Sequence, residues 1–243
     1  MPRTRGQGIA RLALVIGAVA VVLLAVTGPG YRAGWMSLGT ALRQLFAWAT
    51  YAGMAATGLA LVGLAWGRGS ARRTAAVALV LGLLSLYFPW RFQQAAGGVP
   101  PIHDITTDIV TPPQFVEVAA LRLDLAAPNG LDLPVETINQ QIAAYPEIQP
   151  LFLPVPPAEA YDRARTLVGD RGWEVVADDA AGRRIEATAT TFWFRFRDDV
   201  AVRVSAVPDG TSRVDMRSVS RLGRSDLGTN ARRVREFLAD LAR

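Results

Sequence analysis

Residues 215–233, DMRSVSRLGRSDLGTNARR, concentrate polar side chains that could bind a charged ligand. Nineteen residues hold five Arg, three Ser, two Asp, two Gly and one Asn. Arg forms bidentate hydrogen bonds with phosphate and carboxylate, and Gly223 and Gly228 permit backbone geometry that other residues avoid. A helix starting near Thr229 or Asn230, either of which could cap it, would also favour negative charge. The candidates for this anion site are Arg217, Ser220, Arg221, Arg224, Ser225, Asp226, Asn230 and Arg233.

The same segment could instead form an internal network that ties the end of a strand to the start of a helix. In this alternative, Arg217 and Arg221 hold Asp215 and Asp226, and no ligand is bound. Buried polar loops are commonly satisfied within their own chain. The internal network is therefore the favoured interpretation of the segment, and the anion site is the second.

A second group of candidates could support acid–base or metal chemistry. Its members are His103, Asp104, Asp108, Asp198 and Asp199. A hard cation needs several converging oxygens, but adjacent aspartates on a regular strand point to opposite faces. Pairing of these acids with arginines is the simpler expectation. The arginines available for it are Arg195, Arg197, Arg203 and Arg217.

An enzyme is the less favoured alternative. A serine hydrolase would need a base beside its nucleophile, yet the only histidine is His103 and no G-x-S-x-G motif is present. A metal-dependent hydrolase would have to use the aspartates of the second group. We therefore predict no catalytic residue, no metal site and no cofactor.

Charge is strongly segregated along the 243 residues. Residues 1–97 contain nine Arg and no acid, whereas residues 98–243 contain seventeen Arg against twenty-one acids. The C-terminal part is thus acidic and lacks the positive field that nucleic acid binding requires, so no nucleic acid partner is expected. The absence of Cys excludes disulfides and thiolate metal sites.

Three uncharged apolar runs predict transmembrane helices at about residues 12–28, 45–66 and 75–91. A buried helical core is the alternative for all three, and a cleaved signal peptide is the alternative for the first. Arginines cluster in the N-terminal tail (Arg3, Arg5, Arg11) and in the second loop, GRGSARR. The positive-inside rule then predicts a cytoplasmic N-terminus and a periplasmic or extracellular C-terminal domain at the inner (plasma) membrane. A stripe of small residues at Ala52, Ala56 and Ala60 is expected to pack the three spans together.

The remainder divides into a Pro-rich arm and a domain, so the predicted boundaries are 1–97, 98–157 and 158–243. The arm holds eleven of the fifteen Pro, but its apolar residues predict an extended segment packed on the domain, with a short helix at 135–144. Hydrophobic periodicity predicts helices at 158–168 and 231–241, and strands at 173–177, 184–191, 200–206 and 213–220. Phe192, Phe194 and Phe196 alternate with Trp193, Arg195 and Arg197 and predict an extension of the second strand or a new strand after a bulge. The fold class is α+β, a curved antiparallel sheet with both helices on one face, similar to helix-grip folds.

Residues 103–238 resemble the bacterial and plastid family catalogued as domain of unknown function 1499. The matching pieces are IHDITTD with the PPQF that follows, YPEIQPL, GWEVV, RRIEATATT, FRDDVAVRV and VDMRSVSRLGRSDLGTNARRVREFL. The resemblance implies a membrane-associated or envelope protein and no particular activity. We therefore expect a non-catalytic binding or scaffolding module of the envelope, with the lipid bilayer and an anionic lipid or envelope polymer as partners. The sequence does not identify protein partners.

Overall fold

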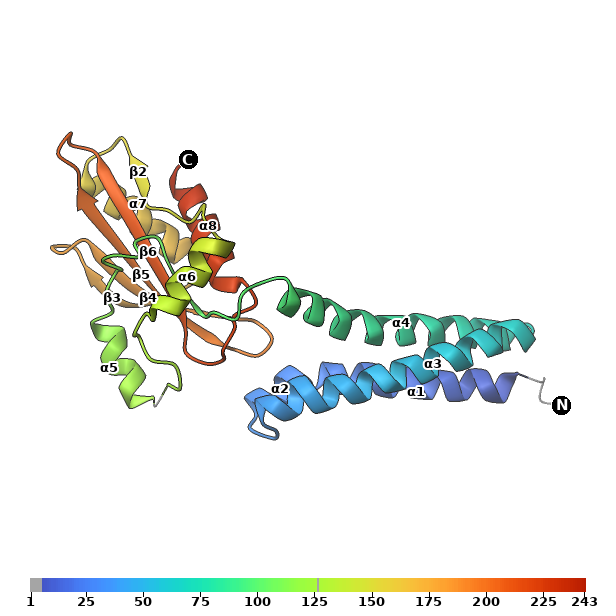
Figure 1. The fold of residues 1–243 in the computed structure, drawn as a ribbon. Coiled ribbons are helices and arrows are strands. Elements are labelled where there is room, and N and C mark those ends of the chain that lie inside the picture. Colours follow the sequence, from blue (N-terminus) through green and yellow to red (C-terminus); the bar gives the residue numbers. More distant parts are fainter. Residues whose placement is uncertain (1–5, 126) are drawn as a thin grey trace. The chain divides into compact units, whose positions relative to one another are not determined.

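The computed structural model describes residues 6–125 and 127–243 (Figure 1). These residues divide into two compact units. The helical unit contains the chain up to Gln94 together with Trp193–Arg195, and the sheet unit contains Ala95–Phe192 and Phe196–Arg243. Arg3 and Arg5, on which the orientation prediction partly depends, lie outside the described residues.

In the described part of the chain, three helical segments are long and apolar enough to cross a membrane. Their bounds are Gln7–Arg32, Thr40–Trp66 and Ser70–Gly97. The helices within them are α1 (Gln7–Ala25), α2 (Thr27–Arg32), the π-helix η1 (Thr40–Leu45), α3 (Phe46–Trp66) and α4 (Ser70–Gly97). Each segment is longer than the predicted span, because helical hydrogen bonding continues into the polar residues that flank the apolar run.

Small residues line the interior of the helical unit. Ala13, Ala60 and Ala78, one from each of the three candidate segments, form a buried cluster. Gly17 lies close to its neighbours, and a Cβ added there would lie 3.1 Å from the Cβ of Leu81. The expected small-residue stripe on α3 is buried at Ala56, together with Ala60. Close approach of small residues therefore packs the three helical segments against one another.

The sheet unit is α+β, as expected from the sequence. Among the described residues six strands form one antiparallel sheet in the order β1-β6-β5-β4-β3, with β2 also pairing with β6. The strands are β1 (Asp104–Thr106), β2 (Leu151–Leu153), β3 (Glu174–Asp179), β4 (Arg184–Thr190), β5 (Arg197–Ala206) and β6 (Ser212–Ser220). Periodicity identified β3 to β6. The three-residue β1 and β2 are too short to show an alternating pattern.

One face of the sheet carries the apolar core. Helices α7 (Pro157–Asp170) and α8 (Thr229–Leu241) both pack on this face (Figure 1). Ile185, Val200 and Met216 from three strands contact the apolar sides of the two helices. Apolar side chains recur every second residue along the strands and about every 3.6 residues along the helices, so each element has one apolar side. Burial of these sides favours packing of the helices on the sheet.

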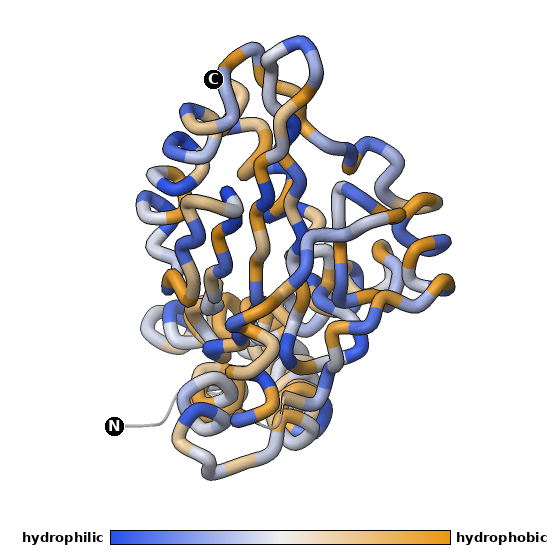
Figure 2. The backbone as a smooth tube through the Cα atoms, turned by 90° about the vertical axis from the view of Figure 1, so that its left-hand side faces the viewer, coloured by the Kyte–Doolittle hydropathy of each residue, from blue (hydrophilic) through white to orange (hydrophobic). Residues whose placement is uncertain are grey.

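The opposite face of the sheet carries charged and polar residues, yet it is also buried. Hydrophilic and hydrophobic residues alternate along the strands (Figure 2). Glu186 and Asp199 are fully buried, and Phe115 and Val118 pack against Ala201 and Val219 of this face. We call this the charged face. Its buried residues are Asp104, Glu186, Thr188, Asp199, Asp215, Arg217 and Arg221.

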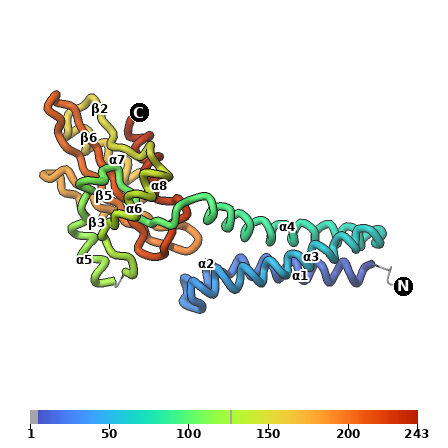
Figure 3. The backbone as a smooth tube through the Cα atoms, in the orientation of Figure 1, coloured from blue at the N-terminus to red at the C-terminus, as the bar shows by residue number. Residues whose placement is uncertain are grey.

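The Pro-rich arm supplies the cover of the charged face. Figure 3 traces it from the end of α4 through β1 and α5 (Glu117–Asp124) to α6 (Val135–Ala144) and β2. Helix α6 has the predicted bounds. Helix α5 was not predicted, because the Pro content of the arm argued against regular helix. It lies between Pro113 and Pro128, and the Glu186 carboxylate accepts hydrogen bonds from the N–H groups of Val116 (2.9 Å) and Val118 (2.8 Å) at its start.

The prediction that Phe192, Phe194 and Phe196 continue a strand was wrong. Residues 191–196 form a hairpin loop between β4 and β5, and pairing resumes at Thr190 and Arg197. The loop closes because Thr191 N–H donates to the Phe196 carbonyl at 2.8 Å and Phe196 N–H donates to Thr191 Oγ1 at 2.8 Å. Arg195 adopts a left-handed conformation (φ 58°), which breaks the extended geometry.

Candidate functional site

The charged face is built from ion pairs that join the arm to the central strands. Asp104 on β1 and Arg217 on β6 form the first of them. Arg217 donates from Nε to Asp104 Oδ1 at 3.1 Å and from Nη2 to Oδ2 at 2.7 Å, and both side chains are about 3% exposed. Arg217 also donates to the Leu131 carbonyl at 2.6 Å and lies over the Phe115 ring. Burial raises the pKa of Asp104, although Arg217 opposes the shift.

A second group of ion pairs contains two carboxylates and two guanidiniums. Asp108 from the arm and Asp215 from β6 both accept hydrogen bonds from Arg203 and Arg213, at 2.8–3.0 Å for the Nη2 donors. Burial alone would raise the pKa of Asp108, but hydrogen bonds from Thr111, Val110 and Arg203 hold it below its ordinary value. The prediction that Arg217 and Arg221 hold Asp215 was wrong, because Arg217 binds Asp104 of β1 and Arg221 binds Asp199 of β5.

The third group is unbalanced. Arg221 binds Asp199 bidentately, from Nε to Oδ2 at 2.9 Å and from Nη2 to Oδ1 at 2.7 Å, while Thr188 Oγ1 donates to Asp199 Oδ1 at 2.8 Å. Arg122 approaches the same carboxylate from α5, with Nε 3.1 Å from Oδ2. Two buried guanidiniums thus share one buried carboxylate. We call Arg122, Asp199 and Arg221 the arginine pair site.

Several donors of the arginine pair site make no hydrogen bond among the described residues, although Arg122 Nε forms an ion pair with Asp199. Arg122 Nε and Nη2 and Arg221 Nη1 are buried and make no hydrogen bond there. Arg122 is 5% exposed and Arg221 6% exposed. Burial lowers the pKa of Arg122, with Asp199 opposing and Arg221 adding to the shift. Buried donors without partners are costly, so this site is one anion short of balance.

The apolar face holds a separate polar cluster at the start of α8. Asn230 is fully buried, donates to the His103 carbonyl (2.9 Å) and Ser220 Oγ (3.0 Å), and accepts from Ser218 Oγ (2.7 Å). Arg233 contacts Asn230 Oδ1 and Ser218 Oγ and binds Asp198 at 2.6 Å. These candidates therefore form an internal network, and their hydrogen-bonding groups are used within the chain.

The Asp226 side chain caps the start of α8, which begins at Thr229, in place of the predicted Thr229 or Asn230 cap. Its carboxylate accepts the N–H of Gly228 at 2.8 Å and that of Asn230 at 2.7 Å. Burial raises the pKa of Asp226 despite these bonds. The predicted pairing of Asp226 with Arg217 or Arg221 was therefore wrong, because backbone amides occupy its oxygens.

Two further candidates lie in the loop before α8. Ser225 Oγ accepts the N–H of Leu227 at 3.2 Å, which serves the turn. Arg224 is exposed, and no hydrogen bond or ion pair joins it to the described residues. Arg224 is therefore available to solvent, but it lacks neighbouring groups that would define a pocket around a ligand.

The second candidate group does not converge. Asp104 binds Arg217, Asp108 binds Arg203 and Arg213, Asp198 binds Arg233 and Asp199 binds Arg221, while His103 contributes its carbonyl. Asp198 and Asp199 lie on opposite faces of the sheet, as the strand period requires. Within residues 6–125 and 127–243, no group of three or more His, Cys, Asp or Glu side chains could hold a metal ion.

The motifs that carry the family resemblance thus lie on the faces just described, with the 215–233 segment forming β6, the loop and the start of α8. Residues 104–241 match the family described as "Protein of unknown function (DUF1499)". The chain belongs to the DUF1499 family. A comparison with curated proteins finds no match.

Arg122 is the residue of this DUF1499 domain that the sequence prediction missed. It lies in the run LRLDL, where Leu121, Leu123 and Leu125 flank it. An arginine between leucines that pack on a sheet could have indicated a buried cation. Because α5 was not predicted, the position of this run relative to the sheet was unknown. The other members of the arginine pair site, Asp199 and Arg221, were named as candidates in two different groups.

Proposed function

We propose that this DUF1499 protein is a non-catalytic, membrane-anchored module that binds a singly charged oxyanion, the phosphodiester head group of an anionic lipid, at the arginine pair site. The observation that carries the proposal is the pairing of two buried guanidiniums, Arg122 and Arg221, with the single carboxylate of Asp199. Guanidinium groups suit bidentate recognition of phosphate oxygens. A bound monoanion would supply the missing charge and accept the donors without partners.

The cover of the site supports a lipid as the source of the oxyanion. Arg122 lies on α5, and the same helix exposes Leu123 (81%) to its surroundings. Val116 and Leu125, which flank α5, are each 48% exposed. A lipid would bring its charge to Arg122 and its apolar part to these side chains. An envelope polymer with phosphodiester links shares the charged chemistry but would leave this apolar surface uncovered.

The proposal includes the membrane topology. Three membrane crossings would put the sheet unit on the side opposite the N-terminus, and the arginines of residues 68–73 support a cytoplasmic position for the second loop. The domain then lies outside the cytoplasm. Alkaline phosphatase fused after Arg243 should be active, and a fluorescent protein that folds only in the cytoplasm should stay dark at the same position. The reverse pair of results would refute this orientation.

The binding proposal is tested by thermal unfolding of the full chain in a neutral detergent. Glycerophosphoglycerol, a soluble lipid head group, is the probe at constant ionic strength, with acetate in parallel. At 100 times the dissociation constant, a ligand adds about 2.7 kcal/mol to stability, which is roughly 5–10 °C in Tm for a domain of this size. Glycerophosphoglycerol should raise the Tm of the wild type by this amount, and acetate should raise it less.

The deciding variant is Arg122→Met, and Arg224→Ala is its matched control. Arg122→Met removes the unbalanced charge and leaves the bidentate Arg221–Asp199 pair. It should keep the Tm of the probe-free protein within about 2–4 °C and lose the response to the probe. Arg224→Ala removes an exposed arginine and should respond as the wild type does. A Tm response to the probe that persists in Arg122→Met would show that the probe binds another surface. A response that is lost only in Arg224→Ala would show the same. Absence of any response in the wild type would overturn the proposal.

A further inference from the structure

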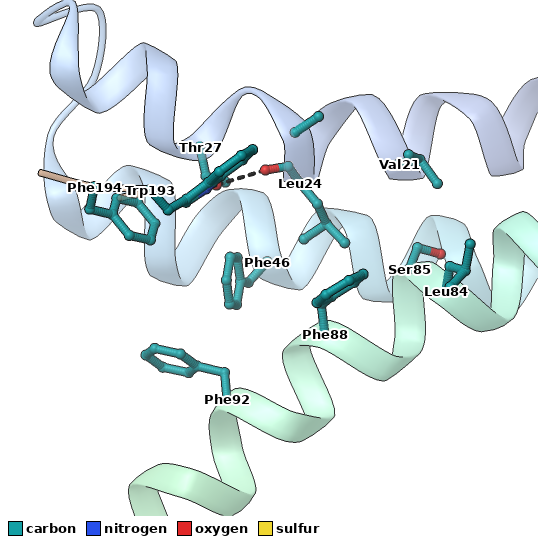
Figure 4. Close-up of a pocket in the computed structure, with 11 residues that line it drawn as sticks. Val21, Leu24, Thr27, Phe46, Leu84, Ser85, Phe88, Phe92, Trp193 and Phe194 are labelled. Atoms are coloured by element: carbon teal, nitrogen blue, oxygen red, sulfur yellow. Dashed lines mark hydrogen bonds between the residues drawn. The ribbon is translucent and has the colours of Figure 1, made fainter. Parts of the chain in front are cut away.

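The helical unit contains an apolar pocket of about 480 Å³. Residues 193–195 of the β4–β5 loop belong to this unit. Figure 4 shows aromatic rings lining the pocket from α3, α4 and that loop, while the α1–α2 region contributes aliphatic side chains and Thr27. The residues that line it and carry the argument are Ala25, Phe46, Phe88, Phe92, Trp193 and Phe194.

The polar groups of the pocket are already used. Thr27 Oγ1 donates to the Leu24 carbonyl at 2.7 Å, and Ser85 Oγ donates to the Gly82 carbonyl at 2.8 Å. The remaining lining side chains are aliphatic or aromatic apart from the Trp193 ring nitrogen, which donates to Thr27 Oγ1 at 3.2 Å. A polar ligand would find no free donor here and would lose its hydration. The chemistry of the pocket therefore selects an apolar occupant.

Aromatic residues form much of the wall of the pocket. Trp193 lies on the backbone of Gly28, where an added Cβ would be 2.7 Å from the indole ring. Phe46 and Phe92 meet edge to face with centroids 5.4 Å apart, and Tyr31 and Phe194 do so at 6.1 Å. Gly28 thus permits the close approach that places Trp193 at the pocket, where its amphipathic ring suits a membrane interface.

We infer that this pocket holds one acyl chain of a bilayer lipid. A volume of about 480 Å³ lies within the range of about 300–1,000 Å³ for small-molecule sites. The helices that line it are those able to span a membrane, so acyl chains are the apolar molecules present around them at highest concentration. The site holds the tail and leaves the head group at the level of Trp193. It is independent of the oxyanion proposal, which concerns the sheet unit.

The test fills the pocket and measures retained lipid. The full chain is reconstituted with phosphatidylglycerol and phosphatidylethanolamine, extracted in mild detergent, washed and weighed by native mass spectrometry. Ala25→Phe places a ring in the pocket. Ala55→Phe makes the same change at an exposed position of α3 that does not line it. Measured in the Arg122→Met background, which removes the proposed oxyanion site, the parent chain and Ala55→Phe should retain one lipid per chain, and Ala25→Phe should retain at least five-fold less.

Four further outcomes bear on the inference. Equal retention in Ala25→Phe and its parent chain would show ordinary lipid contact around the helices and would overturn the inference, as would absence of retained lipid in the wild type. Gly28→Ala displaces Trp193 without occupying the pocket and should also reduce retention. Arg122→Met, which tests the oxyanion site, should retain the lipid, so failure of one proposal is distinguishable from failure of the other.

Discussion

Removal of the Asp104 carboxylate should destabilise the sheet unit far more than removal of the whole Asp104–Arg217 pair. The pair joins the arm to β6 through two hydrogen bonds of 2.7 and 3.1 Å, and both side chains are about 3% exposed. Asp104→Ala leaves the Arg217 guanidinium buried with only the Leu131 carbonyl as an acceptor. An uncompensated buried charge costs about 3–5 kcal/mol, which is roughly 6–20 °C in Tm for a domain of this size.

The double variant Asp104→Leu with Arg217→Met removes both charges and fills their volume. Replacement of a complete buried pair by apolar residues is often neutral, but the Leu131 carbonyl loses its donor here. An unsatisfied buried acceptor costs about 1–3 kcal/mol, so the double variant should lose no more than that and should exceed the single variant in stability.

The assay is thermal unfolding of the full chain in detergent, followed by near-ultraviolet circular dichroism. Asp132→Ala, at an exposed position outside the network, controls for loss of an aspartate. Two results would refute the reasoning. The first is a loss below about 1 kcal/mol for Asp104→Ala, which is the scale of an exposed pair. The second is a double variant less stable than the single one.

Two further predictions concern single carboxylates. Asp226→Ala removes both hydrogen bonds to backbone amides at the start of α8 and should lower stability by about 1–2 kcal/mol; unchanged helix content and Tm by circular dichroism would argue against this role. Burial tends to raise the pKa of Asp108, but hydrogen bonds from Thr111 and Arg203 hold it below 3.8, so its ionised form stabilises the fold above that pH and the contribution disappears as pH falls further. The Tm difference between wild type and Asp108→Asn should therefore shrink below pH 3.8, and a difference independent of pH would contradict the assignment.

Local periodicity predicted the elements that bury an apolar face. Val200, Val202 and Val204 recur every second residue, and Val234, Phe237 and Leu241 recur at helical spacing, so β5 and α8 were identified from their own sequence. The α+β class followed from the order of such elements. Short β1 and helix α5 were missed because their positions depend on contacts with distant residues, such as the Glu186 carboxylate at the start of α5.

The candidate site was predictable in composition but not in pairing. The sequence named Asp104, Asp199, Arg217 and Arg221, and all four lie on the charged face. Their partners could not be read from spacing, because Asp104 and Arg217 are 113 residues apart and sequence distance does not decide which carboxylate an arginine meets. The polar half of the strand alternation also gave no sign that it would be buried, since that depends on the arm folding over it.

The unequal roles of the two arginines at Asp199 provide the last prediction. Arg221 binds Asp199 through two hydrogen bonds, whereas Arg122 approaches the carboxylate at 3.1 Å without hydrogen-bond geometry. Arg221→Met therefore removes the main partner of a carboxylate with no solvent exposure and should cost about 3–5 kcal/mol whether or not an oxyanion is present.

Arg122→Met instead removes the charge in excess, so its effect on stability should depend on the oxyanion. Without glycerophosphoglycerol the variant should be nearly neutral, and with it the variant should fall behind the wild type by the binding energy. A site that served only to hold α5 against the sheet would give a different pattern, with Arg122→Met destabilised equally in both conditions because the ion pair to Asp199 is lost in each. Unfolding of the two variants with and without the probe thus separates a ligand site from a structural clamp, since only a ligand makes the cost of losing Arg122 depend on what is dissolved in the buffer.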